Sequence, residues 1–158
     1  MAVRKEKMIM TEFVIKPKKN IKIKDISVGS IFMDDTDRFM KTAIEIGGMT
    51  VCINLKTGRG ERTEHNFCPE LVAKNFKFSV SNSYIETDIG RLNEGDIVTF
   101  EKIDGVYMAI SYLYRDRFRN FFMNIENAEM KNPDDIVDMY RSYAVTVRKR
   151  DITFLLNI

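Results

Sequence analysis

The chain has 158 residues, of which 25 are basic and 23 are acidic, and its formal net charge is +2. This length fits one domain or two very small ones, and it can bury a core without a metal or a disulfide. No apolar run approaches the roughly 20 residues of a membrane span, and the N-terminus lacks the apolar core of a signal peptide. We therefore expect a cytoplasmic protein with no membrane partner.

The small net charge conceals an uneven distribution. Residues 1–24 contain eight basic and two acidic residues, a net charge of +6, so the other 134 residues carry −4. Such an asymmetry indicates a polyanionic partner. We expect residues 1–20 to form a basic N-terminal arm, and a solvated tail or a short first strand at 11–15 explains the segment equally well.

Motifs for catalysis and metal binding are absent from the sequence. The chain lacks G-x-x-x-x-G-K-[ST], G-x-G-x-x-G, G-x-S-x-G and H-E-x-x-H. Its one histidine, His65, and its two cysteines, Cys52 and Cys68, have no fourth zinc ligand at a suitable spacing. We expect no catalytic residue, no metal and no cofactor, and hence a binding protein rather than an enzyme.

Residues 21–75 follow the pattern of a small antiparallel β domain. Alternating isoleucine and lysine predict a strand at 21–24 with Lys22 and Lys24 on one face. Gly47-Gly48 predicts a tight hairpin turn. Four further strands are predicted, at 30–33, 38–44, 49–55 and 61–67. Short strands at this spacing favour an SH3-like barrel.

Residues 85–158 are predicted to form a small α+β domain. Its opening phrase, Leu92-Asn-Glu-Gly95-Asp-Ile97, has the pattern of Ile26-Ser-Val-Gly29-Ser-Ile31, which lies 66 positions earlier. An internal duplication explains this similarity, and so does a sequence pattern that is common at the start of β-strands. The segment 115–125 is either a hairpin or a helix, and periodicity does not decide between them. The boundary between the domains is expected near 70–90.

A helix is the clearest element of the second half. Asn132-Pro133 followed by two aspartates predicts a helix over 133–142, because an asparagine cap, a first-turn proline and acidic residues favour a helix N-terminus. Strands are predicted at 144–147 and 151–156, on either side of a basic turn at 148–150. The expected buried face of the helix consists of Ile136, Met139, Tyr140 and Tyr143.

Clusters of positive charge provide the candidate nucleic-acid site, because lysine and arginine bind phosphates without reading sequence. One cluster, at residues 115–119, follows Tyr112 and Tyr114. Basic residues beside aromatic ones suit phosphate contact combined with base stacking. A run such as 148–150 is more often only a solvated surface. The candidate residues are Lys16, Lys18, Lys19, Lys22 and Lys24 in the arm and first strand, Lys56, Arg59 and Arg62 around a turn, and Arg115, Arg117 and Arg119.

Residues 20–72 carry a family resemblance. The segments Ile26-Ser-Val-Gly29-Ser-Ile31-Phe32, Phe39-Met-Lys-Thr and Val51-Cys-Ile-Asn-Leu55-Lys-Thr-Gly58 resemble small Tudor/KOW-like or SH3-like barrels. With its length, its basic head and its many isoleucines, lysines, asparagines and methionines, the chain resembles the MotB family of transcription modulators of T-even phages.

The resemblance implies a KOW-like N-terminal domain and DNA binding with little sequence preference. It also implies an early phage protein that acts in host takeover in the infected bacterial cell, at the nucleoid. The family offers no catalytic residues. The basic positions that match its DNA-contacting role are Lys18, Lys19, Lys22, Lys24, Lys56, Arg59 and Arg62.

Three functions compete. We expect a non-enzymatic protein that contacts the phosphate backbone of double-stranded DNA. The alternative is a protein-interaction module, whose acidic body engages a basic host transcription or nucleoid protein. The third possibility is an RNA-binding protein in which Tyr112, Tyr114 and Phe118 stack on unpaired bases.

Overall fold

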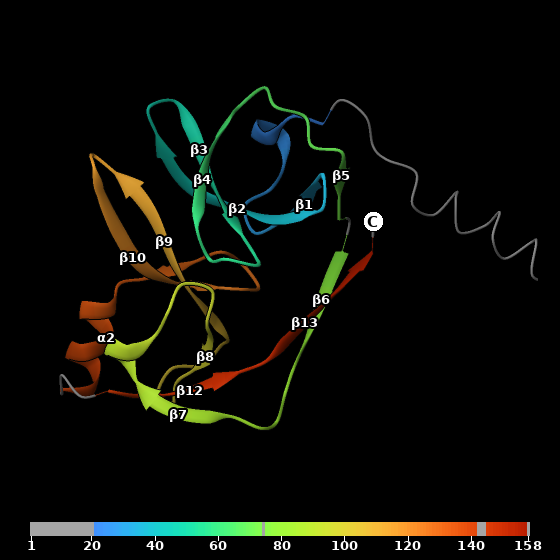
Figure 1. Ribbon diagram of the computed structural model, residues 1–158. Helices are drawn as coiled ribbons and strands as arrows, with labels where there is room; N and C mark the ends of the chain where they lie inside the picture. Colours follow the sequence, from blue (N-terminus) through green and yellow to red (C-terminus); the bar gives the residue numbers. More distant parts are fainter. Residues whose placement is uncertain (1–20, 74, 142–144, 158) are drawn as a thin grey trace, which may run out of the picture.

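The computed structural model describes residues 21–73, 75–141 and 145–157, and within them the fold is mainly β, as the sequence predicts (Figure 1). The predicted basic arm, residues 1–20, lies outside the described residues. No helix in the described ranges is long and apolar enough to cross a bilayer.

The first half of the chain forms a five-stranded antiparallel sheet in the order β4-β3-β2-β1-β5. The strands predicted at 30–33, 38–44 and 49–55 are confirmed, and Gly47-Gly48 turns between two of them with φ of +59° and +76°. The strand predicted at 61–67 is confirmed in its first half only. The five strands are β1 (Ile31–Asp34), β2 (Asp37–Ile46), β3 (Met49–Asn54), β4 (Gly60–Glu64) and β5 (Leu71–Val72).

The strand predicted at 21–24 is wrong, because this segment contains the 3-10 helix η1 (Ile23–Asp25). A buried amine explains the difference. Lys41, only 9% exposed, places Nζ 2.7 Å from the carbonyl oxygen of Ile23 and 2.6 Å from that of Ile26. A buried ammonium group needs such acceptors, and the turn of η1 points these carbonyls inward. A hydrogen bond to a distant residue therefore overrides the local alternation.

Replacement of Lys41 by Met is expected to lower the free energy of unfolding by about 2 kcal/mol, because the carbonyls of η1 lose a charged donor while the side-chain volume is kept. Chemical denaturation measures the change. The control is Lys77→Met, since Lys77 is exposed on another strand. Equal stability of the two variants would show that the Lys41 amine does not hold η1.

The second half forms a six-stranded sheet in the order β11-β10-β9-β8-β12-β7. The segment 115–125 lies in a hairpin, not a helix. The basic turn predicted at 148–150 is wrong, because β12 continues through Arg150 and pairs with β7 on one edge and β8 on the other. The six strands are β7 (Ile85–Asp88), β8 (Ile97–Thr99), β9 (Tyr107–Tyr114), β10 (Arg117–Asn124), β11 (Met130–Lys131) and β12 (Thr146–Arg150).

The predicted helix is confirmed as α2 (Pro133–Tyr140), and the short helix η2 (Ile89–Arg91) precedes β8. Asn132 caps α2, because its Oδ1 accepts the backbone N–H of Asp134 at 3.0 Å. Its predicted buried face is right for Ile136 and wrong for Met139, which is 53% exposed. Tyr140 is half-buried, and Tyr143 lies outside the described residues.

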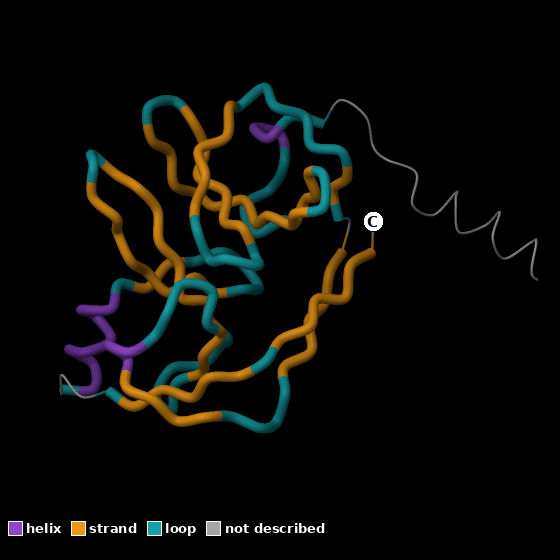
Figure 2. Tube along the Cα trace, viewed as in Figure 1, coloured by secondary structure: helices purple, strands orange, loops and turns teal. Residues whose placement is uncertain are grey.

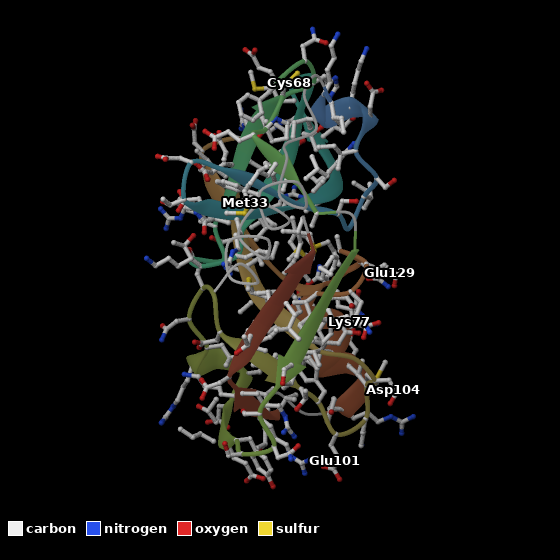
Figure 3. The ribbon with its side chains drawn as sticks, turned by 90° about the vertical axis from the view of Figure 1, so that its right-hand side faces the viewer. Met33, Cys68, Lys77, Glu101, Asp104 and Glu129 are labelled. Carbon is white, nitrogen blue, oxygen red and sulfur yellow. The ribbon has the colours of Figure 1, made fainter. Side chains whose placement is uncertain are left out.

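A two-stranded ribbon forms a third sheet and connects the two halves. Its strands are β6 (Asn75–Val80) and β13 (Ile152–Asn157), and Phe78 pairs with Phe154 at ring centroids 6.5 Å apart. In Figure 3 the ribbon runs along the face toward the viewer, where Lys77 is labelled. The region expected to hold a domain boundary therefore contains β6 and β7.

The two halves of the chain follow one structural plan. Ile31 lies opposite Met40 in the pair β1–β2, and Ile97 lies opposite Met108 in the pair β8–β9. The correspondence continues through β2–β3 and β9–β10, and then through β3–β4 and β10–β11. Finally, β5 returns to pair with β1, as β12 returns to pair with β8.

Each half also begins with the same hydrogen-bonded turn. Gly29, at φ +89°, donates its N–H to the carbonyl of Lys41 at 2.8 Å, and Gly95, at φ +88°, donates to Ala109 at 2.7 Å. These glycines are the shared feature of the two similar phrases in the sequence. Because the agreement extends over the following strands, it supports an internal duplication rather than a common way of entering a strand.

The two repeats, residues 23–72 and 89–150, contact each other in an approximately two-fold symmetric way. A Cβ built on Gly29 would lie 3.1 Å from the backbone of Asn127, and one built on Gly95 would lie 3.1 Å from the backbone of Thr57. Thr57 and Asn127 occupy equivalent turns. One hydrophobic core joins the repeats, with Ile31, Met40, Val51, Ile53 and Leu55 from the first and Ile97, Met108, Ile110, Met123 and Ile125 from the second.

The two cysteines differ in environment. Cys52 is fully buried, and desolvation by this burial raises the pKa of its thiol from 9.0 to about 11, whereas Cys68 is exposed at one end of the molecule (Figure 3). The unfolded chain therefore loses the Cys52 proton at lower pH than the folded chain does. The stabilisation is complete below pH 9 and is lost as the pH rises toward 11.

The free energy of unfolding is expected to fall by roughly 2 kcal/mol more in the wild type than in Cys52→Ala when the pH rises from 8 to 11, because only the wild type carries the buried thiol. Urea denaturation at both pH values measures the difference. Cys68→Ala is the matched control and should behave as the wild type. Parallel curves for the Cys52 variant and the wild type would contradict the expectation.

Candidate nucleic-acid interface

The hairpin formed by β9 and β10 extends beyond its sheet. β8 pairs with β9 only at Tyr107 and Met108, so the far end of the hairpin has no strand on that side within the second sheet (Figure 1). Arg115 and Asp116 form its two-residue turn with φ of +49° and +62°, the positive values that tight hairpin turns require. Residues 115–120 are all exposed.

Arginine and aromatic side chains cover both faces of this end. Residues that lie opposite each other in a strand pair share a face, so Tyr114 and Arg117 lie on one face. Arg119 and Arg115 place their guanidinium carbons 4.4 and 5.3 Å from the centroid of the Tyr114 ring. Phe118 lies on the other face and is 53% exposed. We call residues 113–120 the hairpin end.

The first repeat adds two arginines to this surface, Arg62 on β4 and Arg59 just before that strand. Arg62 Nη2 donates to the carbonyl of Leu113 at 3.2 Å, and Arg59 lies over the Phe118 ring at 5.0 Å. The backbone connects here too, since Ser111 N–H donates to the carbonyl of Gly58 at 3.0 Å. The structure thus brings together the predicted clusters around residues 59–62 and 115–119.

Only part of this positive charge is free. Arg59 contacts both carboxylate oxygens of Glu94 at 3.3 Å, and Ser111 Oγ donates to the same carboxylate at 2.6 Å. The hydrogen bond from Ser111 has the largest effect, and together with those from Arg59 it lowers the pKa of Glu94. The ionised carboxylate therefore offsets the positive charge of Arg59. Within the described residues, the three arginines of the hairpin end form no salt bridge.

The other predicted site residues lie elsewhere. Lys22 and Lys24 do not share a strand face. Lys24 lies on η1, whose backbone donates to the carbonyls of His65 and Phe67 at 3.1 and 2.8 Å. Lys56 is exposed in the turn between β3 and β4. Three of the predicted lysines, Lys16, Lys18 and Lys19, lie outside the described residues.

The aromatic residues proposed for base stacking differ in exposure. Tyr112 is 6% exposed and stacks on Phe121 at 5.7 Å, so it belongs to the core and cannot stack on a base. Tyr114 is half-buried beside its arginines, and Phe118 is exposed. Base stacking at this surface therefore depends mainly on Phe118 and less on the half-buried Tyr114.

A second arginine–aromatic group involves the basic run 148–150, which the sequence indicated as a fourth basic cluster without its aromatic partner. Arg148 and Arg150 on β12 place their guanidinium carbons 4.8 and 5.0 Å from the Tyr84 ring centroid. Arg150 is also fixed by Thr99, whose Oγ1 accepts its Nε–H at 2.7 Å. Tyr84 lies more than 60 positions before these arginines, and only the pairing of β7 with β12 brings them together. No local pattern in the sequence could have found this contact.

The described residues contain no group of three or more histidine, cysteine, aspartate or glutamate side chains that could hold a metal ion. Comparisons of the chain with protein-family models, with curated proteins and with solved structures find no match. The resemblance to the MotB family therefore stays a prediction.

Proposed function

We propose that the protein binds nucleic acid through the hairpin end, with double-stranded DNA as its ligand and little sequence preference. The observation that carries the proposal is the set of three exposed arginines on this hairpin, without salt bridges among the described residues and beside Tyr114. Guanidinium groups form bidentate hydrogen bonds with phosphate oxygens. Contacts with the phosphate backbone do not depend on the base sequence.

Several further features belong to the same proposal. The strand order of the first sheet, in which β5 returns to pair with β1, supports an SH3-like or KOW-like barrel in the first repeat. The arm residues Lys16, Lys18 and Lys19 would add phosphate contacts. A role of an early phage protein in modulating transcription follows from the family resemblance alone.

The test is a titration of labelled duplex DNA, single-stranded DNA and RNA of equal length at several salt concentrations. We expect the logarithm of the association constant to fall linearly with log[salt], with a slope of about −0.9 for each phosphate contacted on duplex DNA. We also expect duplex DNA to bind best. Stronger binding of single strands would favour the RNA-binding alternative, in which Phe118 and Tyr114 stack on bases. No binding to any of the three ligands would reject a nucleic-acid function.

A further inference from the structure

A cavity of about 290 Å³ opens on the first repeat, beside β4. The rings of Phe32 and Phe39 stack in its wall, with centroids 5.5 Å apart. The side chains that matter at this cavity are three phenylalanines and three carboxylates: Phe32, Phe39, Phe67, Asp34, Glu61 and Glu64. We call it the Phe32 cavity.

The Phe32 cavity is negatively charged. Within the described residues its three carboxylates form no salt bridge. The one guanidinium that lines it, on Arg62, already donates to the carbonyl of Leu113. Aromatic rings beside unpaired carboxylates favour a cation, because a cation gains both from the ring faces and from the opposite charge.

The second repeat shows what covers the equivalent surface. The strand pairing places Val98 and Tyr107 where the first repeat has Phe32 and Phe39. The backbone carbonyl of Val145 accepts the N–H of the first residue of η2, and the backbone carbonyl of Phe67 accepts the N–H of the first residue of η1. Val145 therefore corresponds to Phe67. In the second repeat, α2 lies over this surface and packs Ile136, 1% exposed, into the cluster that contains Val98 and Val145.

The first repeat has no such cover of its own. Residues 132–144 connect β11 to Val145 and include α2, whereas residues 62–66 make the equivalent connection as the end of β4 and a turn (Figure 2). The charges differ as well. Glu61 lies where the second repeat has Lys131, and Asp34, the last residue of β1, lies where the second repeat has Phe100, just after β8.

We propose that the Phe32 cavity binds a short segment of a basic partner protein. An apolar side chain of that segment takes the place of Ile136 against Phe39 and Phe67. A neighbouring lysine or arginine enters between Asp34 and the glutamates of β4. The site is independent of the proposed DNA binding, because a duplex phosphate backbone is repelled by the carboxylates that attract the partner.

The probe is a fluorescein-labelled peptide of alternating leucine and lysine residues, with glycines at both ends. The full chain is added to the peptide at low salt, and fluorescence anisotropy measures binding. Two charge-neutralising variants, Asp34→Gln with Glu61→Gln and Glu61→Gln with Glu64→Gln, are expected to weaken binding roughly tenfold. The matched control is Glu126→Gln with Glu129→Gln, which removes two exposed carboxylates from the turn between β10 and β11 in the second repeat. Glu129 is labelled in Figure 3. This control should leave peptide affinity unchanged.

Three results would overturn the proposal. Equal loss of affinity in the control would show attraction to net charge rather than to the cavity. Equal binding of a peptide with glutamate for lysine would exclude recognition of the cation. Tenfold tighter binding after Lys16, Lys18 and Lys19 are replaced by Gln, together with unchanged binding of the same arm variant once Glu61→Gln and Glu64→Gln are added, would show that the chain's own arm occupies the cavity. Duplex DNA titration of the cavity variants separates this site from the hairpin end, since their DNA affinity should not fall.

Discussion

Charge reversal of Arg117 and Arg119 to Glu is expected to weaken duplex DNA binding by roughly tenfold or more and to reduce the salt slope by about two. Both side chains are exposed on the hairpin end, on the face that carries Tyr114, and they form no salt bridge among the described residues. Each would lose a phosphate contact and introduce repulsion. Fluorescence anisotropy at several salt concentrations measures both quantities.

The matched control is the reversal of Arg38 and Lys77 to Glu, which changes the net charge equally at exposed positions outside the hairpin end that form no salt bridge among the described residues. A much smaller loss in this control would locate binding at the hairpin. If both double variants lose affinity equally, binding responds to overall charge and the proposed interface is rejected. If neither loses affinity, the DNA-binding residues lie elsewhere, and reversal of the arm lysines becomes the next test.

Replacement of Gly58 by Ala is expected to destabilise the protein by about 3 kcal/mol or more. Gly58 has φ +76°, which L-residues adopt at a cost, and it lies where the repeats touch. A new Cβ would collide with the backbone N of Gly95 and would lie 2.6 Å from the carbonyl oxygen of Ala109. Neither atom belongs to a flexible side chain, so the repeats would have to separate.

The duplication supplies the control for this variant. Ala128 is the equivalent residue of the second repeat, since Gly58 N–H donates to Asn54 as Ala128 N–H donates to Asn124, and it already carries a Cβ at φ +62°. Ala128→Gly is expected to change stability by no more than about 1 kcal/mol, because relief of the strained φ offsets the lost methyl group. Thermal and chemical denaturation compare the two variants. Similar effects of both would mean that the contact at Gly58 does not limit stability.

Local features of the fold could be predicted from the sequence. The strands from residue 30 to residue 55 alternate with polar or glycine turns, and the cap at Asn132 needs only its neighbours. Elements that depend on distant partners could not be predicted. Lys41 turns the segment at Ile23 into η1, and strand partners on both edges extend β12 through Arg150.

The candidate site likewise has a local part that the sequence could predict and a part that depends on distant contacts. Arg115, Arg117 and Arg119 lie beside Tyr114 in one hairpin, so their spacing and the aromatic neighbour were visible in the sequence. The approach of β4 to this hairpin was not, because Arg62 and Leu113 are 51 positions apart. Nor could the sequence show that the first repeat lacks the cover that α2 provides, because that comparison needs the strand pairing of both repeats.

The β6–β13 ribbon has a consequence for the route by which the chain folds. Its partners are far apart in sequence, from Val80 with Ile152 to Asn75 with Asn157, whereas most other pairs lie in hairpins. Hairpins close quickly, and such distant pairs close slowly. The strand β6 therefore stays an open edge until the second repeat has formed. At high concentration, β6 of one molecule and β13 of another can meet first, so refolding at low concentration should reduce strand exchange between molecules.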